Sequence, residues 1–483
     1  MSESPDLFSE PPERLRSLGF RNALAFIGPG LIIASVTIGS GELVWASRSG
    51  AVFGYQMLWC FLLAGVFKAI QVYVAARHLT LTGEHPMVSW KAIPGPPLWF
   101  PLLIALPTLM VMPIAFSGIS EILGGYLREL TSLSMSDRAV GPFGGFEFWE
   151  NFWASCVLTV CFVLAMSSTL TTLERVSAVV LGLIVICATI SVVACQPNVT
   201  EIVVGLTVPI VPDYEPWVER DYAATFAGRS PWLEVALYLS AVGGGTFDYI
   251  GYVGMIRDKK WGLAGSPVAS REELDRASDE QVARARTWTR AAMLDIGISF
   301  TSVILVTLLF AILGALVLHT EQRIPAKETL LSEQELFLTQ LHPQLLWLYR
   351  GGVFLAFIGT LYGAFEIYRH TVVESARALL PQWSADSHVT RWRSLTVAYC
   401  YGGGMIMMWL PKQIAGDVVG RMTFGAIIGG ATLCGLWCFA MLWTDYARLP
   451  RALRMSGVLW WSTLVAGLVM TTLGVQTLVV YFS

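Results

Sequence analysis

Residues 23–54 read ALAFIGPGLIIASVTIGSGELVWASRSGAVFG, an apolar run long enough to cross a bilayer as a helix, with Gly39-Ser40-Gly41-Glu42 at its middle. A second run, residues 235–254, reads VALYLSAVGGGTFDYIGYVG and contains Gly243-Gly244-Gly245-Thr246, with Asp248 close behind. Each glycine inside a helix costs about 1 kcal/mol relative to alanine, so both runs predict helices that are interrupted at bilayer depth. Unwound backbone survives in a membrane only where it lines a cavity or is buried in protein. Both interruptions are therefore candidate binding sites.

The composition is that of a membrane protein. Of the 483 residues, 54% are hydrophobic and only 14% are charged, whereas soluble globular chains carry about 25% charged residues. The same composition excludes a disordered or a collagen-like chain. The formal net charge of −3 disfavours a basic nucleic-acid binder. We therefore expect the lipid bilayer, and no nucleic acid, among the partners of this chain.

The apolar stretches predict the number of membrane crossings. A crossing helix needs about 20 mostly apolar residues, and the stretches that meet this requirement are 23–47, 53–76, 98–124, 150–168, 173–195, 232–256, 288–318, 345–368, 394–410, 418–444 and 457–481. They predict an all-α integral membrane protein of about eleven transmembrane helices. Residues 23–483 would form one transmembrane domain, preceded by a polar cytosolic tail, residues 1–22.

The distribution of Lys and Arg predicts the orientation in the membrane. With the N-terminus placed inside, the cytosolic segments hold roughly twice as many Lys and Arg residues as the external ones. We therefore expect a multi-pass protein of the cell membrane with a cytosolic N-terminus and an external C-terminus. The oligomeric state is left open.

The two interruptions lie five helices apart, at matching positions in two blocks of five helices. This arrangement is typical of an inverted-repeat transporter that binds its substrate near the midplane of the membrane. The repeats would cover residues 23–195 and 232–444, followed by an extra helix at 457–481. The alternative is that these glycines only let neighbouring helices pack closely.

The first interrupted run also carries a family resemblance. Residues 28–59, GPGLIIASVTIGSGELVWASRSGAVFGYQMLW, resemble without a gap the first helix of the Nramp (natural resistance-associated macrophage protein) transporters of divalent transition metals. Weaker similarity continues at Thr82-Gly83, at Ser120-Glu121-Ile122, at Asp295 and between Thr360 and Glu374. The resemblance implies the LeuT-type fold, with helices 1 to 5 and 6 to 10 as inverted repeats and with helices 1 and 6 broken.

This sequence departs from the family at the residues that hold the metal. Gly39, Ser40 and Glu42 stand where the family has the Asp, Pro and Asn of its first helix. Gly244, Gly245 and Thr246 stand where its sixth helix has Met, Pro and His. Thioethers favour soft metals, so loss of the Met argues against Mn²⁺ or Fe²⁺ uptake. Proton coupling of the family type is also disfavoured, because that His is missing and Gly118 replaces an Asp of helix 3.

The altered residues suit a small anion. Broken helices present the backbone N–H groups of their second halves, which carry a partial positive charge, and glycines allow a ligand to approach the backbone closely. Bicarbonate fits this description in size and charge, and Na⁺ is a possible coupling ion, with no other cofactor expected. The predicted substrate-binding residues are Gly39, Ser40, Gly41, Glu42, Gly243, Gly244, Gly245, Thr246 and Asp248. By analogy with the sodium sites of the LeuT-type fold, which the resemblance implies, the predicted ligands of the coupling ion are the carbonyls of Thr37 and Ile38 and the hydroxyl of Thr360.

A cation interpretation stands beside this one. Glu42 and Asp248 both lie close to the interruptions, and two carboxylates with hydroxyl oxygens would suit Mg²⁺ or Ca²⁺. Each carboxylate could instead cap the start of a half-helix. Of the other charges at bilayer depth, Lys68 is expected to pair with Asp295 or Glu121. Arg48 is expected to be a solvated charge at a helix end, or else to attract anions.

An enzyme is not expected. The sequence lacks the rhomboid Gly-x-Ser-Gly, the zinc-binding His-Glu-x-x-His and the presenilin Gly-x-Gly-Asp patterns. A channel or a receptor-like sensor built on the same fold remains an alternative. Saturable, ion-coupled flux would distinguish a transporter from either.

Overall fold

A computed structural model describes residues 7–16, 25–26, 28–131, 145–167, 171–325, 329–383, 386–411, 414, 416 and 418–482. All regular secondary structure in these residues is helical, as the sequence predicts. Each of the eleven apolar stretches coincides with one or more helices. The helices at these stretches are α3 (Pro29–Thr37), η1 (Ile38–Ala46), α4 (Ser47–Phe53), α5 (Leu58–Thr82), α7 (Trp99–Thr131), α8 (Gly145–Met166), α9 (Thr171–Ala194), α13 (Trp232–Ala241), α14 (Thr246–Lys259), α16 (Asp279–Leu313), η3 (Gly314–His319), α18 (Leu345–Leu379), α19 (Asp386–Trp409), α21 (Val418–Gly425), η6 (Ala426–Thr432), α22 (Leu433–Arg448) and α23 (Gly457–Phe482).

Short helices occupy the connections between these stretches. η1, η3 and η6 are π-helices, whereas the remaining η elements are 3₁₀-helices. The short elements are α1 (Glu13–Arg16), α6 (Pro86–Ser89), η2 (Trp90–Ala92), α10 (Val199–Thr207), α11 (Pro216–Asp221), α12 (Ala223–Phe226), α15 (Arg271–Asp275), η4 (Glu333–Glu335), α17 (Leu336–Thr339), η5 (Pro381–Trp383) and η7 (Arg451–Leu453).

Seven helices in the described residues are long and apolar enough to cross a membrane. The number rises to eight if Leu181–Ala194 and Val199–Thr207, which meet at a bend of 116°, count as one span. The predicted count of eleven is therefore not reached by length and composition alone. Interrupted helices contribute to the difference, because α13 and α14 have only 10 and 14 residues.

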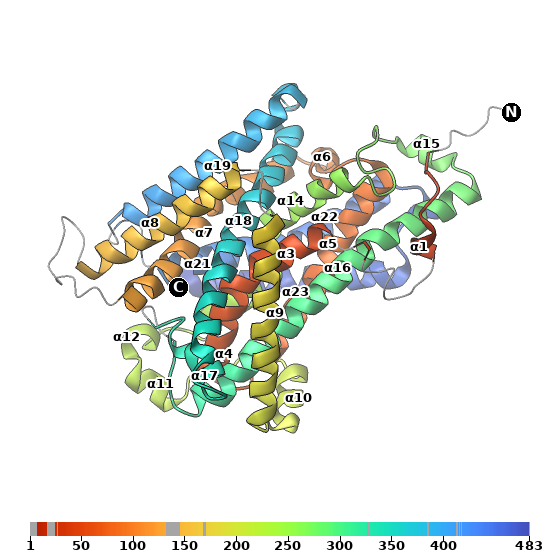
Figure 1. Ribbon diagram of the computed structural model, residues 1–483. Helices are drawn as coiled ribbons and strands as arrows, with labels where there is room; N and C mark the ends of the chain where they lie inside the picture. The colour runs from red at the N-terminus through yellow and green to blue at the C-terminus, as the bar shows by residue number, and fades with distance from the viewer. Residues whose placement is uncertain are drawn as a thin grey trace.

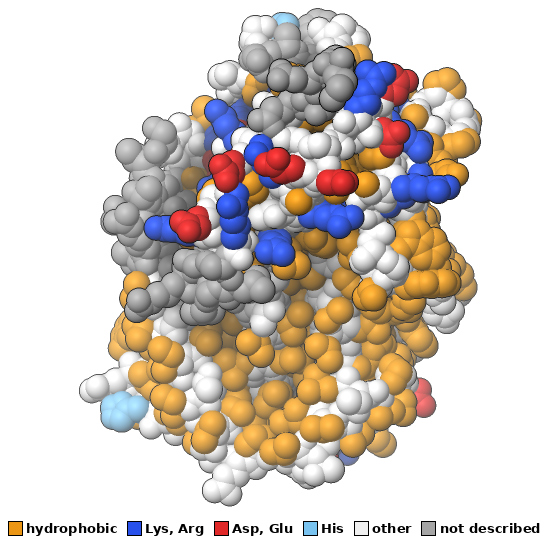
Figure 2. All heavy atoms as spheres, turned by 90° about the vertical axis from the view of Figure 1, so that its right-hand side faces the viewer, with side chains coloured by type: hydrophobic (Ala, Val, Ile, Leu, Met, Phe, Trp, Pro, Cys, Tyr) orange, Lys and Arg blue, Asp and Glu red, His pale blue; other side chains and the backbone are white. Residues whose placement is uncertain are grey.

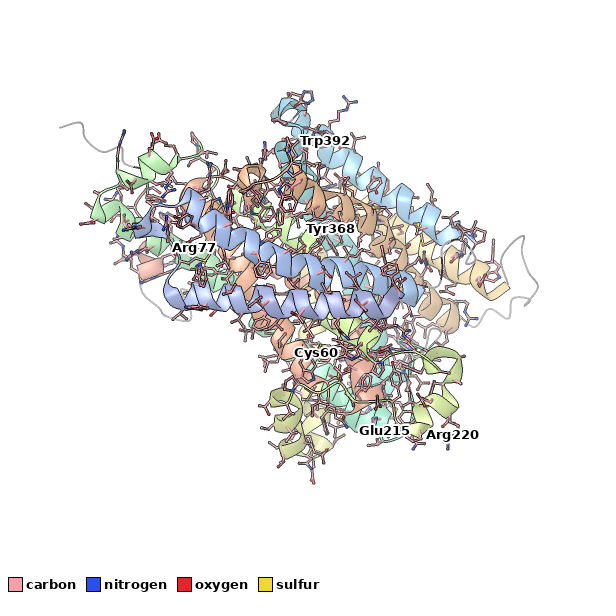
Figure 3. All side chains as sticks on the ribbon, turned by 180° about the vertical axis from the view of Figure 1, so that it is seen from behind. Cys60, Arg77, Glu215, Arg220, Tyr368 and Trp392 are labelled. Carbon is pink, nitrogen blue, oxygen red and sulfur yellow. The ribbon has the colours of Figure 1, made fainter. Side chains whose placement is uncertain are left out.

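The long helices form one bundle (Figure 1). α7 packs on α8 and α19 at one side, and α5 packs on α16 at the other. α14 and α18 contact each other along the interior. Seen from behind, α22 and α23 lie side by side across the bundle (Figure 3). The two halves of the predicted repeat are thus interleaved, and helices from both contribute to the centre.

The surface fits a chain surrounded by lipid over much of its area. Exposed side chains along the long helices are often large and apolar, as at Val163 of α8, Val193 of α9 and Val458 of α23. Toward the end that carries α1 and α15, charged side chains gather in a band, and the surface below this band is mostly hydrophobic (Figure 2). This chain is a multi-pass membrane protein.

Part of the predicted N-terminal tail is packed. Within its described residues, 7–16, Phe8 is completely buried, and its backbone N–H donates to Gln281 Oε1 of α16 at 2.7 Å. The Trp288 indole N–H donates to the Ser9 carbonyl at 2.9 Å. These residues therefore lie against the start of α16.

Two helices meet through their backbones. A Cβ atom added at Gly50 of α4 would lie 1.9 Å from the Ala311 carbonyl oxygen, and one added at Gly314 of η3 would lie 2.2 Å from the Ser47 carbonyl oxygen. Neither glycine can be replaced without moving main chain. We call this contact, in which α4 packs on the end of α16 and on η3, the glycine seam.

The buried charges have partners other than those predicted. Arg48 is 1% exposed and pairs with Glu234 at 3.3 Å, so the expectation of a solvated charge is wrong. Its burial follows from this ion pair together with a hydrogen bond that Arg48 donates to the Pro325 carbonyl. Asp295 accepts from the backbone N–H groups of Gly28 and Gly30 at 2.8 and 2.9 Å, which caps the start of α3.

Glu121 of α7 accepts two hydrogen bonds of 2.7 Å from Arg421 of α21. Both side chains are less than one-tenth exposed. Glu121 and Asp295, the carboxylates expected to pair with Lys68, therefore have other partners, and the contact of both Glu121 oxygens with Arg421 Nη2 links α7 to α21.

Glu121→Gln should destabilise the protein by about 3–5 kcal/mol, because removing one partner leaves a buried guanidinium without its counter-charge. The measurement is the free energy of unfolding of the purified protein in mixed micelles. The matched control is Asp221→Asn, which breaks an exposed pair with Arg220 and should leave stability nearly unchanged. Equal effects of the two substitutions would contradict the prediction.

Candidate functional site

Helix 6 is interrupted where the glycine run predicts. α13 ends at Ala241 and α14 begins at Thr246. Between them, Gly243 and Gly244 have φ angles of +71° and +77°. Side chains disfavour this left-handed region, whereas glycine adopts it readily. The break therefore depends on glycine at these two positions.

The interruption of helix 1 takes another form. Helical structure continues through Gly39-Ser40-Gly41-Glu42, but as the π-helix η1. Single π-helical turns inside α-helices occur often at functional sites. The side chains of Thr37, Ile38, Ser40 and Glu42, and the surroundings of Gly41, lie outside the described part of the structure, and their binding roles remain predictions.

Thr360 of α18 lies against helix 1, at the position proposed for a coupling ion. A Cβ atom added at Gly39 would be 2.1 Å from Thr360 Oγ1, so a side chain there requires Thr360 to move. The Thr360 hydroxyl donates to the Ser35 carbonyl at 3.1 Å. Thr360 and the helix 1 interruption are thus brought together.

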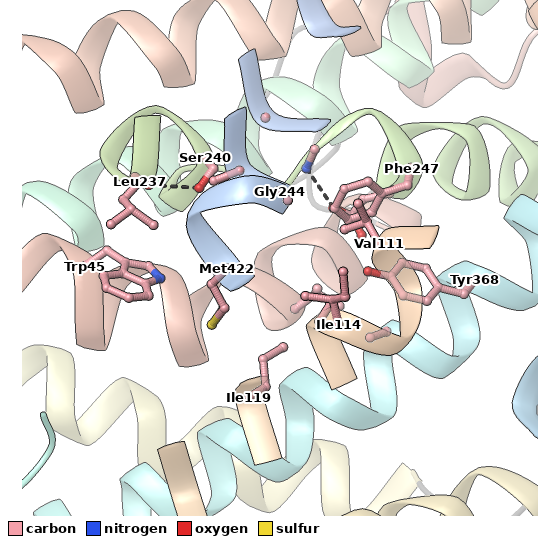
Figure 4. A pocket seen from close by; sticks show the side chains of 18 residues that line it. Trp45, Val111, Ile114, Ile119, Leu237, Ser240, Gly244, Phe247, Tyr368 and Met422 are labelled. Atoms are coloured by element: carbon pink, nitrogen blue, oxygen red, sulfur yellow. Dashed lines mark hydrogen bonds between the residues drawn. The ribbon is translucent and has the colours of Figure 1, made fainter. Parts of the chain in front are cut away.

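A cavity of about 120 Å³ opens at the helix 6 break. Val36 and Trp45 of helix 1 line it, and so do Gly244 and Gly245 of the break. Further lining residues come from α7, α18, α21 and η6 (Figure 4). Most of this lining is apolar, and Ser240, Asp248 and Tyr368 contribute polar side chains.

Asp248 places a carboxylate at this cavity. Its Oδ2 atom accepts from the Gly245 N–H at 2.7 Å, drawn as a dashed line in Figure 4. Its Oδ1 atom is buried and has no hydrogen-bond partner. The side chain therefore caps α14 with one oxygen, as one of the two interpretations predicts, and the second oxygen remains available.

Lys68 of α5 occupies the opposite end of the break. The side chain is completely buried, and its Nζ donates to the carbonyls of Leu239, Val242 and Gly244 at 2.6, 3.0 and 2.6 Å. These carbonyls belong to the last turn of α13 and to the break itself. Sequence reasoning noticed Lys68 but not this contact. The signal that could have indicated this contact was a lone lysine at bilayer depth, in the helix that follows the interrupted helix 1.

Two other side chains near the break differ from expectation. The Thr246 hydroxyl, predicted to face a ligand, donates to the Gly429 carbonyl of η6 at 3.0 Å, because η6 packs directly against the start of α14. Tyr368 of α18, which sequence reasoning missed, lines the cavity and points its hydroxyl toward the break (Figure 4).

The described lining of the cavity holds one carboxylate side chain, that of Asp248. Among the described residues, no group of three or more His, Cys, Asp or Glu side chains is placed to hold a metal ion. The chemistry that the described part of the site offers is that of backbone N–H groups, one carboxylate, one lysine and hydroxyl groups.

Comparison with known proteins gives local sequence similarity. No family model matches the chain. It is 25% identical over 190 residues to the metal transporter Nramp3 of Oryza sativa, a stretch that covers 39% of this chain and 32% of the relative. It is 24% identical over 202 residues to the natural resistance-associated macrophage protein 2 of Homo sapiens, a stretch that covers 42% of this chain and 33% of the human protein. For the divalent metal cation transporter MntH of Bacillus subtilis the identity is 25% over 197 residues, covering 40% and 41%. The match thus spans about a third of the length of the first of these relatives.

The fold is similar over almost the whole chain. A crystal structure of the Eremococcus coleocola manganese transporter aligns with a TM-score of 0.61 and 14% identity, covering 98% of this chain and 90% of that one. A nucleobase-cation-symport-1 family transporter aligns with a TM-score of 0.51 and 13% identity, covering 94% and 92%. The chain has the LeuT-type fold. Its sequence is similar, over about 40% of its length, to Nramp transporters.

Proposed function

We propose that this chain is a secondary active transporter of a small inorganic ion, which binds at the helix 6 break, and that the ion is a small anion such as bicarbonate. The observation that carries the proposal is the cavity at the start of α14, which Gly244 and Gly245 line with their backbone. Relatives with a similar sequence and fold are named as transporters, which supports transport as the activity.

The residues around the cavity favour an anion. The start of a helix carries a partial positive charge and attracts anions to its N–H groups. The Lys68 ammonium adds a full positive charge next to the break. By the resemblance to the Nramp transporters, Gly39 and Gly244 stand where that family has an Asp and a Met. The altered positions thus remove a fixed negative charge and a soft metal ligand from the site.

A hard divalent cation, Mg²⁺ or Ca²⁺, is the second candidate. The observation that favours it is the buried Asp248 Oδ1 atom, which has no hydrogen-bond partner. Carboxylate oxygens are preferred ligands of both ions, and Glu42 would then supply a second carboxylate. Metal transport by the relatives points the same way.

Sodium coupling and orientation complete the proposal. The carbonyls of Thr37 and Ile38 with the Thr360 hydroxyl would hold Na⁺, supported by the contact of Thr360 with helix 1. The protein would lie in the cell membrane with its N-terminus in the cytosol. No enzymatic step is proposed.

The test uses purified protein in sealed liposomes that contain a pH-sensitive dye or a dye for divalent cations. Bicarbonate entering through the protein consumes protons in the lumen, so we expect saturable internal alkalinisation that is faster with an inward Na⁺ gradient and is absent from protein-free liposomes. Saturable entry of Mg²⁺ or Ca²⁺ without a bicarbonate response would replace the anion by the second candidate. Entry of Mn²⁺ alone would overturn both.

A further inference from the structure

Three backbone carbonyl oxygens converge on one point at the end of α13. They belong to Leu239, Val242 and Gly244, and all three accept hydrogen bonds of 2.6 to 3.0 Å from the single Lys68 Nζ atom. The last carbonyls of a helix have no partner within the helix. The positive φ angles of Gly243 and Gly244 turn the chain sharply and place the Gly244 carbonyl beside those of the preceding turn.

Such a group of oxygens is suited to a cation. The C-terminal end of a helix carries a partial negative charge. In transporters with broken helices, unwound carbonyls and half-helix C-termini coordinate the transported or coupling cation. Uncharged carbonyl oxygens in a ring replace the hydration shell of a monovalent ion, as in the filters of potassium channels.

We infer that the carbonyls of Leu239, Val242 and Gly244 form a monovalent-cation site and that the Lys68 ammonium is its permanent occupant. This group is equivalent to a bound ammonium ion attached covalently to α5. The inference does not depend on which ion the protein transports, because it concerns the integrity of the helix 6 break.

A covalently attached cation has two consequences for the site. Because it is tethered to α5, it cannot diffuse away, and its hydrogen bonds hold the end of α13 against α5. It also keeps a positive charge beside Gly244, at the edge of the cavity. Transport would then need no dissolved cation at this end of the break.

The experiment removes the side chain and offers dissolved cations in its place. We expect Lys68→Ala to melt at a lower temperature than the wild type in choline chloride. Ammonium or methylammonium chloride at equal ionic strength should raise the melting temperature of Lys68→Ala saturably, by at least about 2 °C. The wild type should respond equally to all these salts. If Lys68→Ala cannot be purified in choline, recovery of folded protein by extraction in ammonium chloride is the same expected result.

Two further variants make the result specific. Lys68→Gln places an uncharged amide in the same space and should show no response to ammonium. Lys91→Ala removes a lysine of η2, far along the chain from the break, and should behave as the wild type. The inference is overturned if no cation stabilises Lys68→Ala, if folded Lys68→Ala is not recovered in any of the salts, or if Lys91→Ala or the wild type responds as strongly.

Discussion

Gly244→Ala should lower the initial rate of ion uptake into proteoliposomes at least about tenfold. The φ angle of Gly244 is +77°, and an L side chain in this left-handed region costs about 1–2 kcal/mol. A Cβ atom here would also lie 2.4 Å from Asp248 Oδ2, the atom that caps α14. Alanine at this position would therefore change the cavity and displace its carboxylate together.

The matched control for Gly244→Ala is Gly297→Ala in α16, where no heavy atom lies within 4 Å of an added Cβ. Gly297→Ala should keep the wild-type rate. Size-exclusion profiles of both variants would show that each is folded before the rates are compared. Equal uptake by the two variants would show that the helix 6 break is not part of the transport site.

Asp248→Ala should reduce uptake at least about tenfold, whereas Asp248→Asn should retain most of it. In the anion proposal Asp248 acts as a cap, and Asn offers an amide oxygen that can accept the Gly245 N–H in place of Oδ2. Alanine would leave that buried N–H unpaired, which costs about 1–3 kcal/mol. Initial rates of internal alkalinisation, measured at several bicarbonate concentrations, test both variants.

The same two variants separate the candidate functions. Loss of transport in Asp248→Asn, combined with Mg²⁺ or Ca²⁺ entry in the wild type, would make Asp248 a cation ligand. Undiminished transport in Asp248→Ala would exclude both a capping and a ligand role.

Backbone requirements could be predicted from the sequence. The tolerance of a positive φ angle is a property of each residue by itself, so the three glycines of helix 6 predict a break. The structure interrupts the helix between Ala241 and Thr246. Analogy with the sodium sites of the fold placed Thr360 beside helix 1, and the structure has its hydroxyl against Gly39 and the Ser35 carbonyl. The π-helical form of the helix 1 interruption had no such signal, because glycine indicates only that regular α-helix is weakened.

The partners of buried polar side chains could not be predicted. Hydropathy places Lys68 and Arg48 along their helices but does not show which neighbouring helix each faces. That choice depends on how α5 and α4 are rotated and tilted in the bundle. Lys68 consequently has carbonyl partners where a carboxylate was expected, and Arg48 is buried against Glu234 rather than solvated.

The glycine seam joins α4 and η3 into one rigid unit. Helices that touch backbone to backbone, as at Gly50 and Gly314, have no flexible side chains between them to give way, so we expect α4 and η3 to move together. If α4 and η3 tilt together, the backbone next to α4 must change conformation. The adjoining segment is the π-helix η1. Helix 1 would then bend at Gly39-Ser40-Gly41-Glu42, the same segment that is predicted to bind the ion. Ion binding would therefore restrict this bending directly.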